Sequence, residues 1–319
     1  MNAPHLLAYA RVHADRRVGA HDGVTYVDAV DRLMRATWVE DGHTYLSLTY
    51  KYSVLGRDLI TAGHISAARE TAVGPDPFKW PKDLRQAAFV GLATEYDDTA
   101  AFIAARCAMV PTGRQQCEQL LAHREVIMVQ FGSIIFAEEL DADVRRAKMK
   151  QAILGFDMDS GIDAWARTHG NPHSRTLRGQ RIDLGPGIGT YSLEEYWRAQ
   201  RAGTEWMRTR SEAMCEMVAA TMGNSNGARR GRRPPGDRVG PRVKSYLLQE
   251  AEAISRRAKQ RWCQENGLTM INLQHDGVVA HGATDPEAAA RGMSAAATAA
   301  CGYEVTVGYA DLAAPVLAD

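Results

Sequence analysis

The sequence is poor in cysteine and lacks any long apolar run. Its five cysteines are scattered and none belongs to a Cys-x-x-Cys pair, which argues against a structural zinc site or a disulfide framework and favours a reducing, intracellular setting. No apolar run approaches the roughly 18–20 residues that span a bilayer, and the N-terminal segment has no long apolar signal core. We therefore expect no membrane association.

A net charge of either sign is also absent. The 319 residues include 38 Lys and Arg and 38 Asp and Glu, so the formal net charge is zero. No global positive field attracts nucleic acid to such a chain, and any binding of that kind must come from local patches. An apolar content of 45% and a charged content of 24% are typical of a globular protein with a sizeable core.

The pattern of elements predicts an α+β fold. Strands and helices are mixed without the regular alternation of a doubly wound sheet, and no internal repeat is present. Residues 24–39 begin as a strand pattern and continue as a helical one, and a helix opens at Pro81. Further helical patterns cover residues 112–136, 141–154, 192–222, 243–266 and 285–300, and strand patterns cover residues 43–55, 270–281 and 304–309.

Residues 270–281, MINLQHDGVVAH, predict a tight β-hairpin. Two short apolar runs flank the polar centre Gln274–Gly277, as in strand–turn–strand units. The turn carries one carboxylate, Asp276, and a rigidly held carboxylate suits a divalent cation because hard cations prefer oxygen ligands. The alternative is an ordinary hairpin whose turn carries an incidental aspartate.

Asp97 and Asp98 form a second acidic feature, in the segment EYDDTAAF. Adjacent carboxylates repel unless a cation or solvent relieves them, and consecutive strand residues face opposite sides, so only one of the two is expected at a shared site. The alternative is a solvated acidic turn or a helix cap. Two aspartates from distant segments are the minimum protein contribution to two-metal phosphoryl or nucleotidyl transfer.

The segment VRRAKMKQAILGF predicts a helix with a basic face. Arg146 and Lys150 are four residues apart and share that face, with Arg145 beside them. Arginine can bind a triphosphate bidentately and lysine can bind it as a point charge. A solvated basic face is the alternative interpretation.

Together these motifs resemble family A DNA polymerases and the related single-subunit RNA polymerases. In that family an aspartate at a strand end precedes an Arg-x-x-x-Lys helix with a glycine five residues after the lysine, and an apolar-His-Asp-apolar hairpin follows. The matching residues here are Asp97 or Asp98, then Arg146, Lys150 and Gly155, then His275 and Asp276. The spacings, 53 residues from Asp97 to Lys150 and 179 from Asp97 to Asp276, are close to those of the bacterial-type DNA enzymes. The segment Leu84–Val90 and the pair Gly56-Arg57 are similar to upstream segments of the family.

The resemblance covers roughly residues 50–310 and implies a right-hand architecture with an antiparallel palm sheet, helical fingers and a reduced thumb. Residues 51–319 would form the palm and fingers, with residues 223–242 as an Arg-, Gly- and Pro-rich loop, and residues 1–50 would be a thumb-like or accessory segment. The chain has no room for a proofreading domain, and about 90 residues precede the first motif. A full thumb is therefore not expected, which predicts low processivity unless a protein partner supplies grip.

The resemblance also implies roles for individual residues. Asp97 or Asp98 and Asp276 would hold two Mg²⁺ ions, or Mn²⁺ in their place, with His275 beside them. Arg146 and Lys150 would bind the phosphates of an incoming nucleoside triphosphate, and Lys150 would protonate the leaving pyrophosphate. The remaining implied contacts are Leu154, Phe102 and Arg85 near the nucleotide and Gln249 near the primer–template.

Three positions depart from the DNA enzymes. Gly277 stands where they usually carry Glu, whereas the RNA enzymes carry a small residue; Leu154 replaces an aromatic on the fingers helix; and Phe102 replaces a sugar-gating Glu. The bulk of Phe102 favours deoxyribonucleotides, so we predict a compact DNA polymerase. An RNA-synthesising polymerase or primase and a catalytically inactive nucleic-acid-binding replication accessory remain alternatives, as does an unrelated α+β fold.

One segment could provide a local basic patch. Six arginines fall within 14 positions, followed closely by a lysine, and they could follow a DNA or RNA backbone; the alternative is a disordered linker. The residues are Arg229, Arg230, Arg232, Arg233, Arg238, Arg242 and Lys244.

Overall fold

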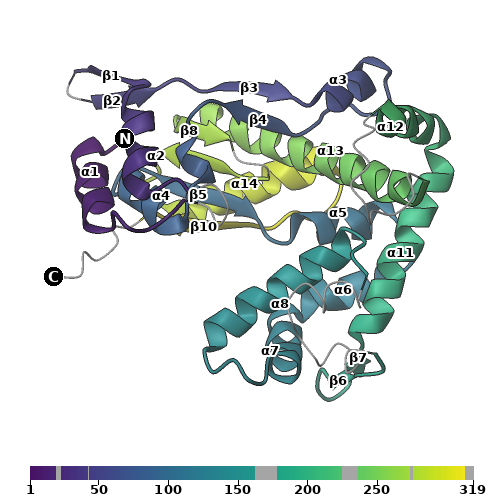
Figure 1. The fold of residues 1–319 in the computed structure, drawn as a ribbon. Helices are drawn as coiled ribbons and strands as arrows, with labels where there is room; N and C mark the ends of the chain where they lie inside the picture. The colour runs from purple at the N-terminus through teal and green to yellow at the C-terminus, as the bar shows by residue number, and fades with distance from the viewer. Residues whose placement is uncertain (19–22, 42, 162–177, 225–235, 274–275, 313–319) are drawn as a thin grey trace. The chain divides into compact units, whose positions relative to one another are not determined.

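The computed structural model describes residues 1–18, 23–41, 43–161, 178–224, 236–273 and 276–312 (Figure 1). The chain divides into two compact units, which we describe separately. The sheet unit comprises Met1–Arg57, Ala67–Thr99 and Glu252–Asp319, and the helical unit comprises Asp58–Ser66 and Ala100–Ala251. Among the described residues, no helix is long and apolar enough to cross a membrane.

The centre of the sheet unit is a four-stranded antiparallel sheet in the order β10-β5-β9-β8. Its strands are β5 (Thr94–Asp98), β8 (Thr269–Leu273), β9 (Val278–His281) and β10 (Val307–Asp311). The predicted hairpin is present as β8 and β9, with a register shift between Met270 and Asn272, while Gln274 and His275 lie outside the described residues. The expected α+β class is confirmed.

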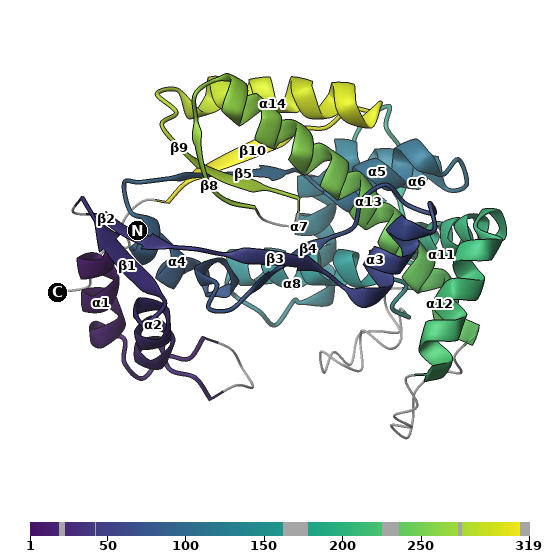
Figure 2. The same cartoon turned by 90° about the horizontal axis from the view of Figure 1, so that it is seen from above.

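Helices cover both faces of this sheet, as Figure 2 shows. Val278 and Ala280 of β9 pack with α14 (Pro286–Cys301) and with the end of α13 (Gly236–Glu265). Val279, between them, packs instead with α1 (Ala3–Val12), α2 (Tyr26–Met34) and α4 (Lys82–Phe89). The alternation of side chains along a strand explains this division, and it also decides which way the carboxylates of β5 point.

The sheet unit also contains two antiparallel strand pairs and a short helix. The pairs are β1 (Thr37–Glu40) with β2 (His43–Leu46) and β3 (Thr49–Tyr52) with β4 (Glu70–Val73), and the short helix η1 (Pro77–Lys79) precedes α4. The expectation of a strand followed by a helix over residues 24–39 is wrong, because α2 comes first and β1 follows. Thr25 and Asp28 form a capping box that starts α2, and this local signal outweighs the strand-like composition.

The helical unit contains α5 (Ala101–Met109), α6 (Arg114–Ala122), α7 (Arg124–Ile135), α8 (Ala142–Asp157), α11 (Leu193–Arg210) and α12 (Glu212–Asn224), with the short strands β6 (Ile182–Asp183) and β7 (Thr190–Tyr191). Helix α3 (Val54–Thr61) and helix α13 contribute residues to both units. Asp141 caps α8 by accepting from the backbone N–H groups of Asp143 and Val144 at 2.8 and 3.1 Å. A continuous apolar cluster, including Phe131, Met149 and Tyr196, fills the interior.

Several predicted boundaries are wrong in this unit. The helix expected over residues 112–136 is interrupted at His123, and the one expected over 192–222 is interrupted at Ser211. The loop expected over residues 223–242 is wrong at both ends, because α12 reaches Asn224 and α13 already begins at Gly236, with Pro241 inside the helix. Residues 225–235 lie outside the described residues. The assignment of palm, fingers and thumb to these units remains a prediction.

Candidate active site

Asp97 and Asp276 form a pair of facing carboxyl groups in the sheet unit. Tyr96 of β5 pairs with Val278 of β9, so the end of β5 and the turn of the hairpin are neighbours. The side chains of Asp97 and Asp276 lie within hydrogen-bonding distance of one another. Asp97 keeps contact with solvent, but its carboxyl group is largely surrounded by protein atoms. Burial is the main cause that raises the pKa of Asp97, and the nearby carboxyl group of Asp276 is the second.

Gly277 allows this close approach. A Cβ atom at position 277 would stand 2.8 Å from Oδ1 of Asp97 and 2.8 Å from the carbonyl oxygen of Tyr96. One of these atoms belongs to the backbone of a central strand and cannot move away cheaply. The residue that departs most clearly from the DNA enzymes therefore has a steric role in the approach of the hairpin to β5.

Asp98 points to the opposite face of β5 and is buried. Lys259 Nζ donates a hydrogen bond to its Oδ1, and Ser255 Oγ donates to its Oδ2 at 2.6 Å. Burial raises the pKa of Asp98, while the ammonium group of Lys259 acts in the opposite direction. Both carboxylate oxygens of Asp98 thus have internal partners, and of the two adjacent aspartates only Asp97 faces Asp276.

The donor set of Asp97 and Asp276 fits a divalent cation. Two carboxyl groups this close repel when both are ionised, and a proton or a cation relieves the repulsion. Among the described residues there is no group of three His, Cys, Asp or Glu side chains that could hold a metal ion. Mg²⁺, however, is commonly bound by one or two carboxylates together with water and substrate phosphates. The two carboxyl groups of Asp97 and Asp276 are therefore enough protein ligands for it. His275 lies outside the described residues.

The predicted basic face lies on α8 in the helical unit. Arg146 donates to both carboxylate oxygens of Glu125 at 2.8 and 2.7 Å, and Lys148 pairs with Glu139 at 2.7 Å. Lys150 is exposed, and its ammonium group has no hydrogen-bond or ion-pair partner among the described residues. Leu154, one turn further, is also exposed, at 38%. On this helix Lys150 is therefore available for a ligand, whereas Arg146 and Lys148 already hold carboxylates.

The other predicted contact residues are dispersed. Arg85 pairs with Glu95 at 3.1 Å in the sheet unit. Gln249 donates to Ser245 Oγ at 2.9 Å on α13, and Phe102 is half-buried on α5. Arg229, Arg230, Arg232 and Arg233 lie outside the described residues.

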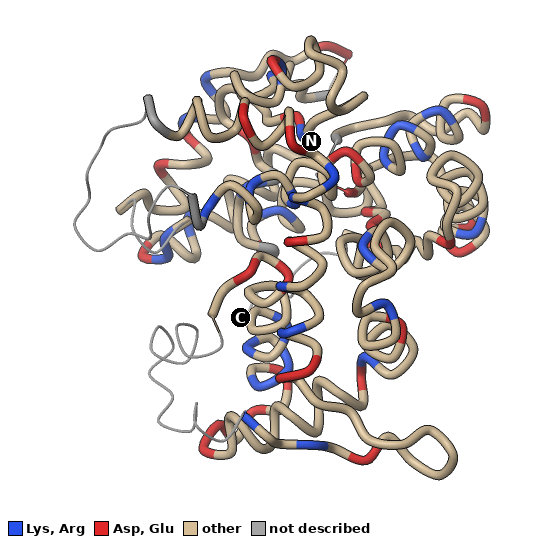
Figure 3. Tube along the Cα trace, turned by 90° about the vertical axis from the view of Figure 1, so that its right-hand side faces the viewer, with Lys and Arg blue, Asp and Glu red and all other residues tan. Residues whose placement is uncertain are grey.

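The prediction for Lys244 requires correction. Lys244 is buried, donates to Gln200 Oε1 at 3.1 Å and lies 3.5 Å from Asp159 Oδ1. Its ammonium group neutralises an internal carboxylate, so it does not belong to a phosphate-binding surface. Arg242, by contrast, is exposed on α13. In Figure 3 basic and acidic residues are interspersed along the same helices, in agreement with the zero net charge.

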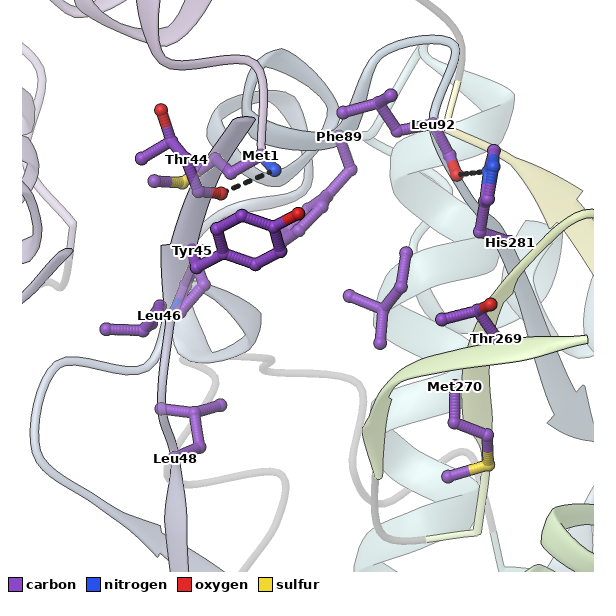
Figure 4. Close-up of a pocket in the computed structure, with 12 residues that line it drawn as sticks. Met1, Thr44, Tyr45, Leu46, Leu48, Phe89, Leu92, Thr269, Met270 and His281 are labelled. Carbon is purple, nitrogen blue, oxygen red and sulfur yellow. Dashed lines mark hydrogen bonds between the residues drawn. The ribbon is translucent and has the colours of Figure 1, made fainter. Parts of the chain in front are cut away.

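A separate apolar pocket of about 440 Å³ lies in the sheet unit (Figure 4). Two hydrogen bonds border it: the Met1 amino group donates to the Thr44 carbonyl at 3.1 Å, and His281 Nδ1 donates to the Leu92 carbonyl at 2.5 Å. Thr269 and His281 face each other at the open end of the hairpin, whereas Asp276 is at its turn. No residue predicted for the active site is among the described residues that line this pocket.

Two side chains near the acidic pair were not predicted from the sequence. Ser255 and Lys259 are one helical turn apart on α13 and reach the same carboxylate. The sequence offers one signal for them, an i, i+4 spacing that puts both side chains on one face of a helix. Their partner is more than 150 positions away in the sequence, and no local pattern could identify it.

Comparison with known proteins supports the fold. No protein-family model matches the chain, and no curated protein matches its sequence. In structure the chain is similar to the POL domain of Pol1 from M. smegmatis, solved in complex with DNA primer-template and dNTP, with a TM-score of 0.52 and 12% sequence identity. The chain has a polymerase-like fold. The match covers 89% of this chain and 50% of that one, so the chain spans about half the length of the Pol1 domain.

Proposed function

We propose that this protein catalyses template-directed nucleotidyl transfer, as a compact DNA polymerase of the family A type with right-hand architecture. The observation that carries the proposal is the facing pair Asp97, on β5, and Asp276, in the turn before the neighbouring strand β9, within a polymerase-like fold. Two aspartates from distant segments are the minimum that two-metal phosphoryl transfer requires of a protein. Solvent contact at Asp97 leaves the pair accessible to substrate.

The proposed chemistry assigns each residue a separate task. Asp97 and Asp276 would hold two Mg²⁺ ions, which supply activation of the attacking hydroxyl group and neutralisation of the leaving pyrophosphate. Lys150 would bind the nucleotide phosphates and provide a proton to the pyrophosphate. Arg146 would also bind the phosphates, either by giving up its hydrogen bonds with Glu125 or while keeping them. Primer–template and nucleoside triphosphate are the proposed substrates, and a protein partner would strengthen the grip on primer–template.

A ribonucleotide-using enzyme of the same fold is the second candidate. It is favoured by Gly277, whose contact with Asp97 leaves no space for a glutamate side chain at that position. It is also favoured by Phe102, which stands where the resemblance places a sugar-gating glutamate. The ring of Phe102 could itself exclude a 2′-hydroxyl group by bulk, and for this reason deoxyribonucleotides are the first substrates to test.

Primer extension tests the proposal directly. A 5′-labelled primer on a longer template would be incubated with Mg²⁺ and either four deoxynucleotides or four ribonucleotides. We expect extension with deoxynucleotides and its loss in Asp276→Asn. Asp31→Asn, which changes an exposed carboxylate on α2, serves as the matched control.

Two results would contradict this proposal. Full activity in Asp276→Asn would show that the acidic pair is not the active site. Tight binding of primer–template without extension in Mg²⁺ or Mn²⁺, with either nucleotide set, would instead identify an inactive accessory protein. Extension with ribonucleotides alone would establish the second candidate.

A further inference from the structure

Lys259 joins three elements of the sheet unit at one point. Its side chain is 0% exposed, and its ammonium group donates both to Oδ1 of Asp98 on β5 and to the backbone carbonyl oxygen of Asp276 in the hairpin turn. Lys259 itself lies on α13. The proposed chemistry uses Asp97 and Asp276 but gives this lysine no task.

The two bonds fix the backbone on both sides of the acidic pair. Asp98 follows Asp97 directly in β5, and the carbonyl oxygen that Lys259 binds belongs to Asp276 itself. Ser255, one turn earlier on α13, holds the second oxygen of Asp98 at 2.6 Å. The strand end and the hairpin turn are thus tied to the same helix, next to the residues whose carboxyl groups face each other.

Neutralisation of Asp98 alone does not account for this arrangement. An ammonium group has three donors, and one of them would be enough to pair Asp98. Here a second donor is directed at the turn of the hairpin. Because Asp276 accepts this bond through its main chain, its own carboxyl group remains available to face Asp97.

We propose that Lys259 is a positioning residue, which sets the separation of the Asp97 and Asp276 carboxyl groups and thereby the affinity of this pair for a divalent cation. The inference rests on the proposed function, since it takes the pair to be a cation site. Lys259 touches neither the cation nor the substrate. It acts through the Asp276 main chain, as outer partners orient metal ligands in other proteins.

Binding of Mn²⁺ alone, followed by electron paramagnetic resonance, tests the inference without any catalytic step. Lys259→Met removes both bonds, and the double variant Asp98→Leu with Lys259→Met also removes the buried carboxylate that would lose its partner. The double variant keeps the net charge of the wild type. We expect it to fold, as judged by circular dichroism, and to bind Mn²⁺ with a Kd about 10-fold or more above the wild type.

The direction in which Mn²⁺ affinity changes shows whether Lys259 acts by positioning the acidic pair or only through its charge. Removal of a positive charge near a cation site strengthens cation binding, so Lys259→Met would bind Mn²⁺ more tightly if charge were its only contribution. We expect weaker binding instead. Lys259→Gln, which leaves a polar side chain beside Asp98, provides the same comparison if the other variants do not fold.

Two different results would overturn different statements. Wild-type Mn²⁺ affinity in the folded double variant, or tighter binding in Lys259→Met or Lys259→Gln, would overturn the positioning role. A wild-type protein that binds no more Mn²⁺ than the Asp97→Asn, Asp276→Asn double variant would overturn the cation site, and with it the proposed function.

Discussion

Position 277 lies so close to strand β5 that a Cβ atom there would stand 2.8 Å from Oδ1 of Asp97. The carbonyl oxygen of Tyr96 is equally close. A glycine at this position is therefore a condition for the approach of the hairpin turn to Asp97. This contact connects a single residue of the sequence to the geometry of the proposed cation site.

Gly277→Ala should push the hairpin turn away from β5. We expect the Kd for Mn²⁺ to rise about 10-fold or more and primer extension to fall at least in proportion. Gly308→Ala is the matched control, because Gly308 pairs with Asp97 from β10 and its Cβ would find only ordinary contacts, the nearest at 3.8 Å. Equal effects of the two substitutions would show that the close contact at position 277 does not determine Mn²⁺ affinity or primer extension.

Substitution of Asp97 should affect cation binding, whereas substitution of Asp98 should affect stability. Asp97→Asn should retain the stability of the wild type but lose Mn²⁺ binding and extension, because its carboxyl group faces Asp276 and solvent. Asp98→Leu should instead cost about 3–5 kcal/mol of unfolding free energy, since it leaves the buried ammonium group of Lys259 without its carboxylate. Urea unfolding and Mn²⁺ titration of both variants distinguish them, and the reverse pattern would contradict the assignment.

Local signals explain what could be predicted from the sequence. The hairpin over residues 270–281 depends on neighbouring residues only, and it is present as β8 and β9. The rule that only one of two adjacent strand residues reaches a shared site is also consistent with the structure. Which of Asp97 and Asp98 does so depends on the side of the sheet that α13 covers, and no local pattern encodes this.

Tertiary contacts account for what was missed. The helix periodicity continues through His123 and Ser211, so the interruptions there left no sign in the apolar pattern. Lys244 was placed with the neighbouring arginines because of its position in the sequence, whereas in the fold it is buried beside Asp159. Lys259 was overlooked because its partners, Asp98 and Asp276, lie on other elements.

Lys150 and Lys148 offer a matched test of the basic face of α8. The Lys150 ammonium group has no partner among the described residues, whereas Lys148 pairs with Glu139 at 2.7 Å. We expect Lys150→Ala to lower kcat/KM for single-nucleotide incorporation about 100-fold, through lost phosphate binding. Lys148→Ala should change it less than about 2-fold, because it removes an exposed ion pair with Glu139 and a contact with the Phe136 ring, both within the helical unit. Similar losses in both would argue that the helix contributes general positive charge rather than a specific contact.

Asp157, in the helical unit, should make stability depend on pH. It is buried, accepts a hydrogen bond from Tyr196 through Oδ1, and has no partner for Oδ2 among the described residues. Burial raises its pKa to about 6, against the hydrogen bond from Tyr196 and the nearby charge of Lys244. Between about pH 4 and pH 6 the folded protein therefore holds a proton that the unfolded chain has released.

The sign of the pH effect follows from this difference in bound protons. The contribution of Asp157 to the free energy of unfolding should fall by up to about 3 kcal/mol as pH rises from about 4 to about 6, and then stay level. Asp157→Asn should make the measured decline shallower by this contribution, while Asp97 and Glu252, whose pKa values are also raised, keep their own. Glu118→Gln, which changes an exposed carboxylate of the same unit, should leave the decline unchanged. Urea unfolding at several pH values measures the slope. A slope in Asp157→Asn as steep as in the wild type would contradict this prediction, because it would mean that folding does not change the pKa of Asp157.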